Sequence, residues 1–398
     1  MDPATYDEDA YHSELLRKMR MSESIVYQAI FAPATVTGGE TMLVAATSSG
    51  MIHVYRLSPV MTLQYWNQVK CGESTAFPGP SLSFQAHPTQ IYSLCFAGDA
   101  TNPLLISGGD QDFRVWRWKD ILLTMEDPAN VKNLLAVHVG YLKRQSLGFR
   151  GTLLPAMEVN DVVVSKNSGH LFLAGGDSVA HEWDVVTQQF TRLFEGHEDY
   201  LHAVRDLHHS QELATSSEDG TLGIWDVRQA RNVEFLRPWQ ATTSSMSSSS
   251  PSPSLWIGAV AHDDSEMWLA CGGGTKQPTG GRSRNAQATR GFLSMWHLPS
   301  RVPVHYTTTT CDVHDVVFHH MDLLSVGNDA SLKKWNRSSG QLLSAARSTV
   351  LSSHFCAVDR ATDIVAVGGA APLIDIYTMP GVVSFSLVVD SESSARAS

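Results

Sequence analysis

The segment from Gly196 to Asp226, GHEDYLHAVRDLHHSQELATSSEDGTLGIWD, constrains the fold more than any other part of this 398-residue chain. Glycine after an aspartate, with apolar residues on either side, is typical of a tight hairpin turn, because glycine adopts positive φ without steric cost. The remaining markers fit three successive antiparallel strands: His197 before the first strand, Thr215 or Ser217 at the end of the second, Asp219 in the turn and Trp225 in the third. The segment therefore predicts one repeat unit of an all-β protein.

The same unit recurs along the chain, and an aromatic residue marks the third strand of each copy. The seven markers are Tyr55, Trp116, Trp183, Trp225, Trp296, Trp335 and Tyr377. Asp110, Asp177, Asp219 and Asp329 each precede a marker by the same turn-plus-strand spacing. Where insertions are absent, the spacing of the markers resembles the period of WD repeats, which is roughly 40–45 residues. The sequence predicts an all-β fold, a seven-bladed WD40 β-propeller over residues 23–389 with a short N-terminal helix.

Three of the predicted blades carry polar residues that suit a buried hydrogen-bond network. Buried polar groups need partners, so such a set holds a blade together rather than performing catalysis. The residues are His87, Ser107, Asp110 and Trp116 in the second blade, His197, Thr215, Ser217, Asp219 and Trp225 in the fourth, and Ser325, Asp329 and Trp335 in the sixth, which has no clear histidine partner.

Four segments and the C-terminal tail fall outside the repeats. Residues 1–22 change from acidic to basic along their length, which favours a helix, and we expect a strap on the propeller rather than a helix for a partner. Residues 119–157 are predicted to contain a short helix and the outer strand of blade two. The Ser-rich linker 240–254 and the tail 390–398 are too polar to pack and are predicted to be disordered. The run VVSFSLV at 382–388 is predicted to complete blade seven as its own outer strand.

The fourth insertion, the loop 275–290, is basic and has no acidic residue. Its cationic side chains are candidate contacts for phosphate groups, and the alternative is a solvated loop without a ligand. The cationic residues are Lys276, Arg282, Arg284 and Arg290. Because the net charge of the chain is −11, we expect any RNA contact to be indirect or weak.

Motifs of catalysis and of cofactor binding do not appear in the sequence, so we predict no enzymatic activity, no cofactor and no metal. Two histidine pairs, His208-His209 and His319-His320, fall between first and second strands. Neighbouring side chains on an extended chain point in opposite directions, so we expect each pair to lie in a surface loop without chelating a metal. No apolar run reaches membrane-spanning length, and no membrane contact is expected.

Several separated stretches resemble one family, the WD-repeat subunits of the THO complex, and plant-type members above all. The stretches are VYQAIFAP (26–33), AGGD (174–177), GHEDYLH (196–202), WLACGGG (268–274), MWHLPS (295–300) and AVGGAAPLIDIY (366–377). The resemblance implies a non-catalytic scaffold that docks on the coiled-coil subunits of THO/TREX and couples transcription and mRNA processing to nuclear export. It also implies a nuclear location, with the cytoplasm as a second compartment.

A second function is indicated by Trp225, Asp226 and Arg228, which form a W-D-x-R sequence. It is similar to the box through which WD-repeat proteins bind the adaptor of cullin-4 ubiquitin ligases, although Gly223 departs from the apolar pattern before it. The chain would then be a substrate receptor. A third reading is a propeller scaffold with neither partner.

Overall fold

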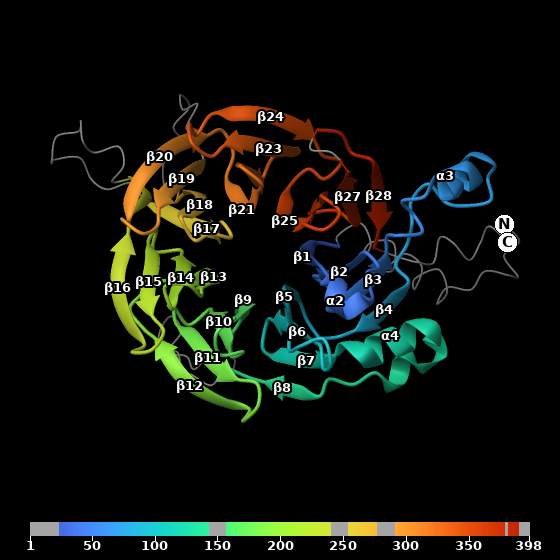
Figure 1. Ribbon diagram of the computed structural model, residues 1–398, viewed down its shortest axis with the longest axis horizontal. Helices are drawn as coiled ribbons and strands as arrows, with labels where there is room; N and C mark the ends of the chain where they lie inside the picture. The colour runs from blue at the N-terminus through green and yellow to red at the C-terminus, as the bar shows by residue number, and fades with distance from the viewer. Residues whose placement is uncertain (1–23, 143–156, 240–253, 277–290, 379–380, 390–398) are drawn as a thin grey trace, which may run out of the picture.

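Seven four-stranded antiparallel sheets form a closed ring in the computed structural model, in which each sheet radiates from the centre of the ring (Figure 1). The structure describes residues 24–142, 157–239, 254–276, 291–378 and 381–389. Within each blade the strands pair in chain order, from the centre to the rim. The predicted all-β, seven-bladed propeller is confirmed.

Each blade consists of an innermost strand, a second strand, a third strand and an outer strand. The innermost strands are β1 (Val26–Phe31), β5 (Ile91–Ala97), β9 (Val159–Val164), β13 (Leu201–Leu207), β17 (Leu255–His262), β21 (Val313–His319) and β25 (Ser353–Asp359). The second strands are β2 (Met42–Thr47), β6 (Leu104–Gly109), β10 (Leu171–Gly175), β14 (Glu212–Ser217), β18 (Trp268–Thr275), β22 (Asp322–Gly327) and β26 (Ile364–Gly369). The third strands are β3 (Met51–Arg56), β7 (Phe113–Arg117), β11 (Ala180–Asp184), β15 (Leu222–Asp226), β19 (Gly291–His297), β23 (Ser331–Asn336) and β27 (Leu373–Tyr377). The outer strands are β4 (Leu82–Gln85), β8 (His138–Gly140), β12 (Gln189–Phe194), β16 (Arg231–Leu236), β20 (Val302–Thr309), β24 (Leu342–Arg347) and β28 (Phe385–Val388).

All seven aromatic markers lie in third strands, as the repeat pattern predicts. Each is buried and packs in an apolar cluster shared with the preceding blade. Among the described residues seven such clusters occur, one at each junction between blades. The core is therefore distributed around the ring, and removal of apolar surface from water between blades holds the disc together.

Four short helices are described: α2 (Ala34–Thr37), α3 (Leu63–Lys70), α4 (Trp118–Glu126) and the 3-10 helix η2 (Pro128–Asn133). The predicted helix and outer strand of blade two are confirmed as α4 and β8. Trp118 and Ile121 of α4 are fully buried between the first two blades. No helix of the described residues is long and apolar enough to cross a bilayer.

At the junction of blades seven and one, the described residues exchange no strand. The C-terminal strand β28 pairs with β27, which confirms that the last blade is completed by its own outer strand. The Tyr55 hydroxyl donates to the Val388 carbonyl at 3.0 Å, and the Val388 amide donates to the Pro78 carbonyl at 3.0 Å. Trp66 of α3 packs on Phe385 with ring centroids 5.5 Å apart. Blade one therefore covers the edge that a free C-terminal strand would expose.

Side chains of the innermost strands also bond one blade to the next. The Asp161 carboxylate in blade three accepts from the Val204 amide in blade four at 3.0 Å. Asp315 in blade six accepts from the Cys356 amide in blade seven at 2.9 Å, and Gln28 bonds Leu94 in the same way. Burial raises the pKa of Asp315 to about 6, although the Cys356 amide and the Arg205 charge favour its ionised form.

Several predictions concern segments that the structure leaves undescribed. The helix of residues 1–22, nearly all of the linker 240–254 and the tail 390–398 lie outside the described residues. Of the basic loop 275–290, only Thr275, which ends β18, and Lys276 are described.

Candidate functional site

Blade four contains the predicted network, and its bonds form a directed chain. The Trp225 indole N–H donates to the Thr215 hydroxyl at 2.8 Å, and His197 Nε2 lies 2.8 Å from the same hydroxyl. His197 Nδ1 lies 2.7 Å from Asp219. A carboxylate only accepts, so Nδ1 carries the imidazole proton and Nε2 accepts from Thr215. Of the two hydroxyls left open by the sequence, Thr215 joins the chain, whereas Ser217 bonds the Asp199 carbonyl and the turn.

Asp219 is the charged end of this chain. Burial alone would raise the pKa of Asp219, but hydrogen bonds from His197, the Thr221 hydroxyl and the Glu198 amide lower it to about 2. The carboxylate is therefore ionised at neutral pH and fixes the orientation of the His197 ring. Because Trp225 and Thr215 are fully buried, the network is structural and offers no surface to a substrate.

Blade two has an equivalent network with one correction. His87 contacts the Ser107 hydroxyl at 2.7 Å, and Trp116 donates to the same hydroxyl at 3.0 Å. The acid is Asp112, 2.5 Å from His87 Nδ1, so the prediction of Asp110 is wrong. Only three residues separate β6 from β7, against four between β14 and β15, so the acid directly before the third strand reaches the imidazole.

Blade six retains half of this arrangement. Trp335 donates to the Ser325 hydroxyl at 2.8 Å, as expected, but no imidazole completes the chain among the described residues. Asp329 instead pairs with Lys333 at 2.6 Å. The predicted residues of this blade are therefore adjacent, but Asp329 belongs to an ion pair rather than to the network.

The W-D-x-R residues differ sharply in exposure. Trp225 is buried and Asp226 nearly so, whereas the Arg228 side chain is 67% exposed. The Arg228 guanidinium donates to Asp226 twice, from Nη2 at 3.1 Å and from Nε at 3.3 Å. Of the three predicted adaptor contacts, Arg228 alone presents its side chain to a partner. Strand direction alternates within a blade, so this turn after β15 lies on the same face as the turns between first and second strands.

The predicted phosphate contacts are only partly described. Lys276 forms an ion pair with Asp199 at 2.9 Å, which offsets its charge within the protein. Arg282, Arg284 and Arg290 lie outside the described residues.

The two histidine pairs contradict the geometric expectation. Both lie at the turns between first and second strands, as predicted, but neighbouring rings do not point apart. Ring centroids are 4.0 Å apart for His208 and His209, and 4.4 Å apart for His319 and His320. His208, His209 and His320 are in turns, whereas His319 is the last residue of β21. His320 has a φ of 52°, so strand alternation does not continue from His319 to His320.

The central channel is a surface that sequence reasoning missed. In every innermost strand one residue is skipped by the pairing with the second strand, as in a β-bulge. The skipped residues are Tyr27, Tyr92, Asn160, His202, Gly258, His314 and His354. Where glycine replaces a side chain, the Trp256 ring fills the space, because a Cβ on Gly258 would lie 2.6 Å from it.

Six rings form an arc around this channel. Adjacent ring centroids are 5.1–6.2 Å apart in the order Tyr92, Tyr27, His354, His314, Trp256 and His202. Glu158 lies at the same cavity of about 390 Å³, and burial, with the charge of Asp110, raises its pKa. Aromatic faces beside a carboxyl group suit stacking against aromatic or cationic side chains. The signal in the sequence was an aromatic residue or histidine one position into the innermost strand, recognisable only once the strand starts are known.

Comparison with known proteins distinguishes this chain from propellers in general. The family WD domain, G-beta repeat matches residues 79–117 and 188–226, which include the inner three strands of blades two and four. THO complex subunit 6 of Arabidopsis thaliana is 27% identical over 96% of both chains. THO complex subunit 6 of Homo sapiens is 26% identical over 91% of this chain and 93% of its own. The guanine nucleotide-binding protein subunit beta-1 of Nicotiana tabacum is 24% identical over only 39% of this chain and 36% of its own.

Proposed function

The chain is a WD-repeat propeller similar to THO complex subunit 6 along nearly its whole length, and from this premise we propose that it is a non-catalytic scaffold subunit of the THO/TREX complex. In this role it docks on the coiled-coil subunits, supports their assembly in the nucleus, and couples transcription and mRNA processing to mRNA export. The observation that carries the proposal is the extent of the similarity, which spans every blade, whereas the G-protein β subunit matches a minor part of the chain.

The geometry supports a binding role. The polar side chains that resemble a catalytic set in sequence are buried, and their polar atoms are hydrogen-bonded to one another. The described residues present to solvent the turns at two faces of a rigid disc, the aromatic channel and the outer strands at the rim, such as β12 and β24. Loops held by a rigid scaffold are the usual place for partner contacts.

Affinity purification of the tagged full chain from nuclear extract, followed by mass spectrometry, tests this proposal. We expect the coiled-coil subunits of THO to be recovered in amounts close to that of the tagged chain. Deletion of residues 1–22 tests whether the predicted N-terminal helix is part of that contact, and loss of THO subunits with an unchanged thermal unfolding midpoint would support it. Absence of THO subunits from the full-chain purification would overturn the proposal.

A second candidate function, binding of the cullin-4 ligase adaptor, is favoured by the exposure of Arg228 at the end of the W-D-x-R sequence. Exposed guanidinium N–H groups can donate to acidic groups on a partner. Arg228→Ala is expected to abolish adaptor recovery and to leave THO recovery unchanged, because the side chain contributes little to folding. Arg231→Ala, an exposed arginine at the start of β16, is the matched control. Adaptor recovery that is insensitive to Arg228→Ala would contradict this assignment.

A further inference from the structure

Two clusters of the same composition occur at equivalent places in the ring. In the first, His208 and His209 of the β13–β14 turn meet Glu266 of the β17–β18 turn in the next blade. In the second, His319 and His320 at the β21–β22 turn meet Asp363 of the β25–β26 turn, again in the next blade. In each cluster one ligand atom from every residue lies within 4.8 Å of the others. The repeat architecture thus places two histidines and one carboxylate together twice.

In the first cluster the carboxylate is held with one oxygen directed at the rings. The His209 backbone amide donates to Glu266 Oε2 at 3.0 Å, which leaves Oε1 free to face the imidazoles. His208 Nδ1 lies 2.5 Å from this Oε1, and His209 Nδ1 lies 3.4 Å from it. Both His208 Nδ1 and Glu266 Oε1 are buried, and their contact lacks the geometry of a hydrogen bond. Buried polar atoms that converge without a good bond are an arrangement that a cation would satisfy.

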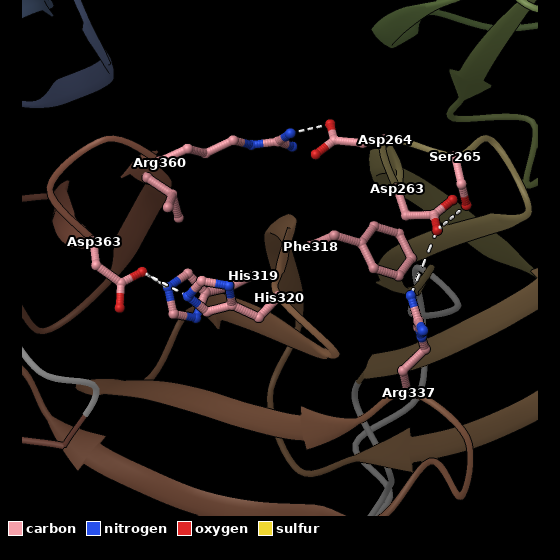
Figure 2. Close-up of a pocket in the computed structure, with 10 residues that line it drawn as sticks. Asp263, Asp264, Ser265, Phe318, His319, His320, Arg337, Arg360 and Asp363 are labelled. Atoms are coloured by element: carbon pink, nitrogen blue, oxygen red, sulfur yellow. Dashed lines mark hydrogen bonds and ion pairs between the residues drawn. The ribbon is translucent and has the colours of Figure 1, made fainter.

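In the second cluster one carboxylate oxygen contacts two imidazole rings. Asp363 Oδ1 lies 2.7 Å from His319 Nε2 and 2.8 Å from His320 Nε2, and Figure 2 shows both rings directed at it. The cluster borders a cavity of about 350 Å³, which leaves room for water beside the three side chains. His319 is buried, whereas the His320 side chain is 69% exposed.

The backbone of these turns places the ligands. His320, Glu266 and Asp363 all have φ between 51° and 64°, the left-handed region that L residues other than glycine seldom adopt. At His320 this conformation directs the ring to the same side as the ring of His319. Both acids occupy a left-handed position in the turn between the first two strands of the following blade, Glu266 two residues before β18 and Asp363 directly before β26.

The donor set selects the kind of ion. Neutral imidazole nitrogens and a carboxylate oxygen are ligands of Zn²⁺, often as three protein ligands with a fourth position open. Calcium and magnesium ions prefer sites made of oxygen alone. We propose that each cluster binds one Zn²⁺ ion through its two imidazoles and its carboxylate, and that the open position takes water or a donor from a partner. This inference is independent of the proposed scaffold function.

Isothermal titration of the full chain with Zn²⁺ in a non-chelating buffer tests the proposal, and two ions per chain are expected. His209→Asn and His320→Asn remove the more exposed histidine of each cluster, with side chains 58% and 69% exposed, so the fold should be unaffected. Each variant should retain one site, with the other weakened at least about tenfold, and the double variant should retain neither. His297→Asn, which removes a histidine that bonds Ser300 outside both clusters, is the matched control.

The outcomes are distinguishable. Unchanged unfolding midpoints of the metal-free variants, with stoichiometries of two, one, one and zero, would support both sites. Two ions bound by the double variant would mean that Zn²⁺ binds elsewhere, and the proposal would be overturned. Absence of saturable binding to the parent chain would overturn it equally.

Discussion

Replacement of Thr215 by valine isolates the energetic contribution of the blade-four network. Valine has nearly the same shape as threonine and is equally suited to a strand, so the change removes a hydroxyl and little else. That hydroxyl accepts from the Trp225 indole and donates to the His197 imidazole, and all three side chains are buried. The variant therefore leaves one buried hydrogen-bond donor and one buried acceptor without a partner.

The magnitude follows from the number of groups left without partners. A buried polar group that loses its partner costs about 1–3 kcal/mol, so two such groups predict a loss of roughly 2–6 kcal/mol in the free energy of unfolding. Blade six supplies a matched comparison, because the Ser325 hydroxyl accepts from Trp335 and bonds no imidazole of the described residues. Ser325→Ala should therefore cost about 1–3 kcal/mol, less than Thr215→Val.

Urea denaturation monitored by tryptophan fluorescence, with thermal unfolding as a second probe, measures these differences. Thr308→Val, on the exposed side of β20, controls for the threonine-to-valine change itself and should stay within about 0.5 kcal/mol of the parent. If Thr215→Val were no more destabilising than Thr308→Val, the reasoning from unpaired buried groups would be refuted.

Two further predictions concern Asp315 of the innermost strand β21 and Gly273 of the second strand β18. Because the folded-state pKa of Asp315 is raised to about 6, its contribution to stability is complete below pH 4 and is lost as pH rises from 4 to 6. Asp315→Asn should therefore gain about 3 kcal/mol relative to the parent between pH 4 and pH 7 in urea titrations, and a pH-independent difference would contradict this. Gly273→Ala should lower the free energy of unfolding by about 2 kcal/mol or more, because its Cβ would collide with the Trp256 carbonyl, and an unchanged urea midpoint would disprove that contact.

The fold was predictable because its signals are local and repeated. Seven aromatic markers at third-strand positions suffice to count the blades, since each marker fills the same place between neighbours. Closure was predictable from the apolar run before the tail, which β28 confirms. The aromatic channel was not, because its lining depends on one skipped residue per strand, such as Tyr27 or His314. Side-chain direction is inferred from the alternation along a strand, and a bulge reverses that alternation. The residues directed at the channel therefore cannot be identified until the strand register is known.

Two of the errors in the site have a common physical cause, which is the conformation of turns. Spacing from the tryptophan selected Asp110, yet a turn one residue shorter brings Asp112 to His87 instead. Strand alternation separated His319 from His320, yet a positive φ in the turn brings both rings to one carboxylate from the next blade. Periodic rules apply within strands and fail at their ends, where the chain reverses and where residues of two blades meet. In a propeller those ends form the two faces of the disc, so the positions that sequence predicts least well are the ones available to ions and partners.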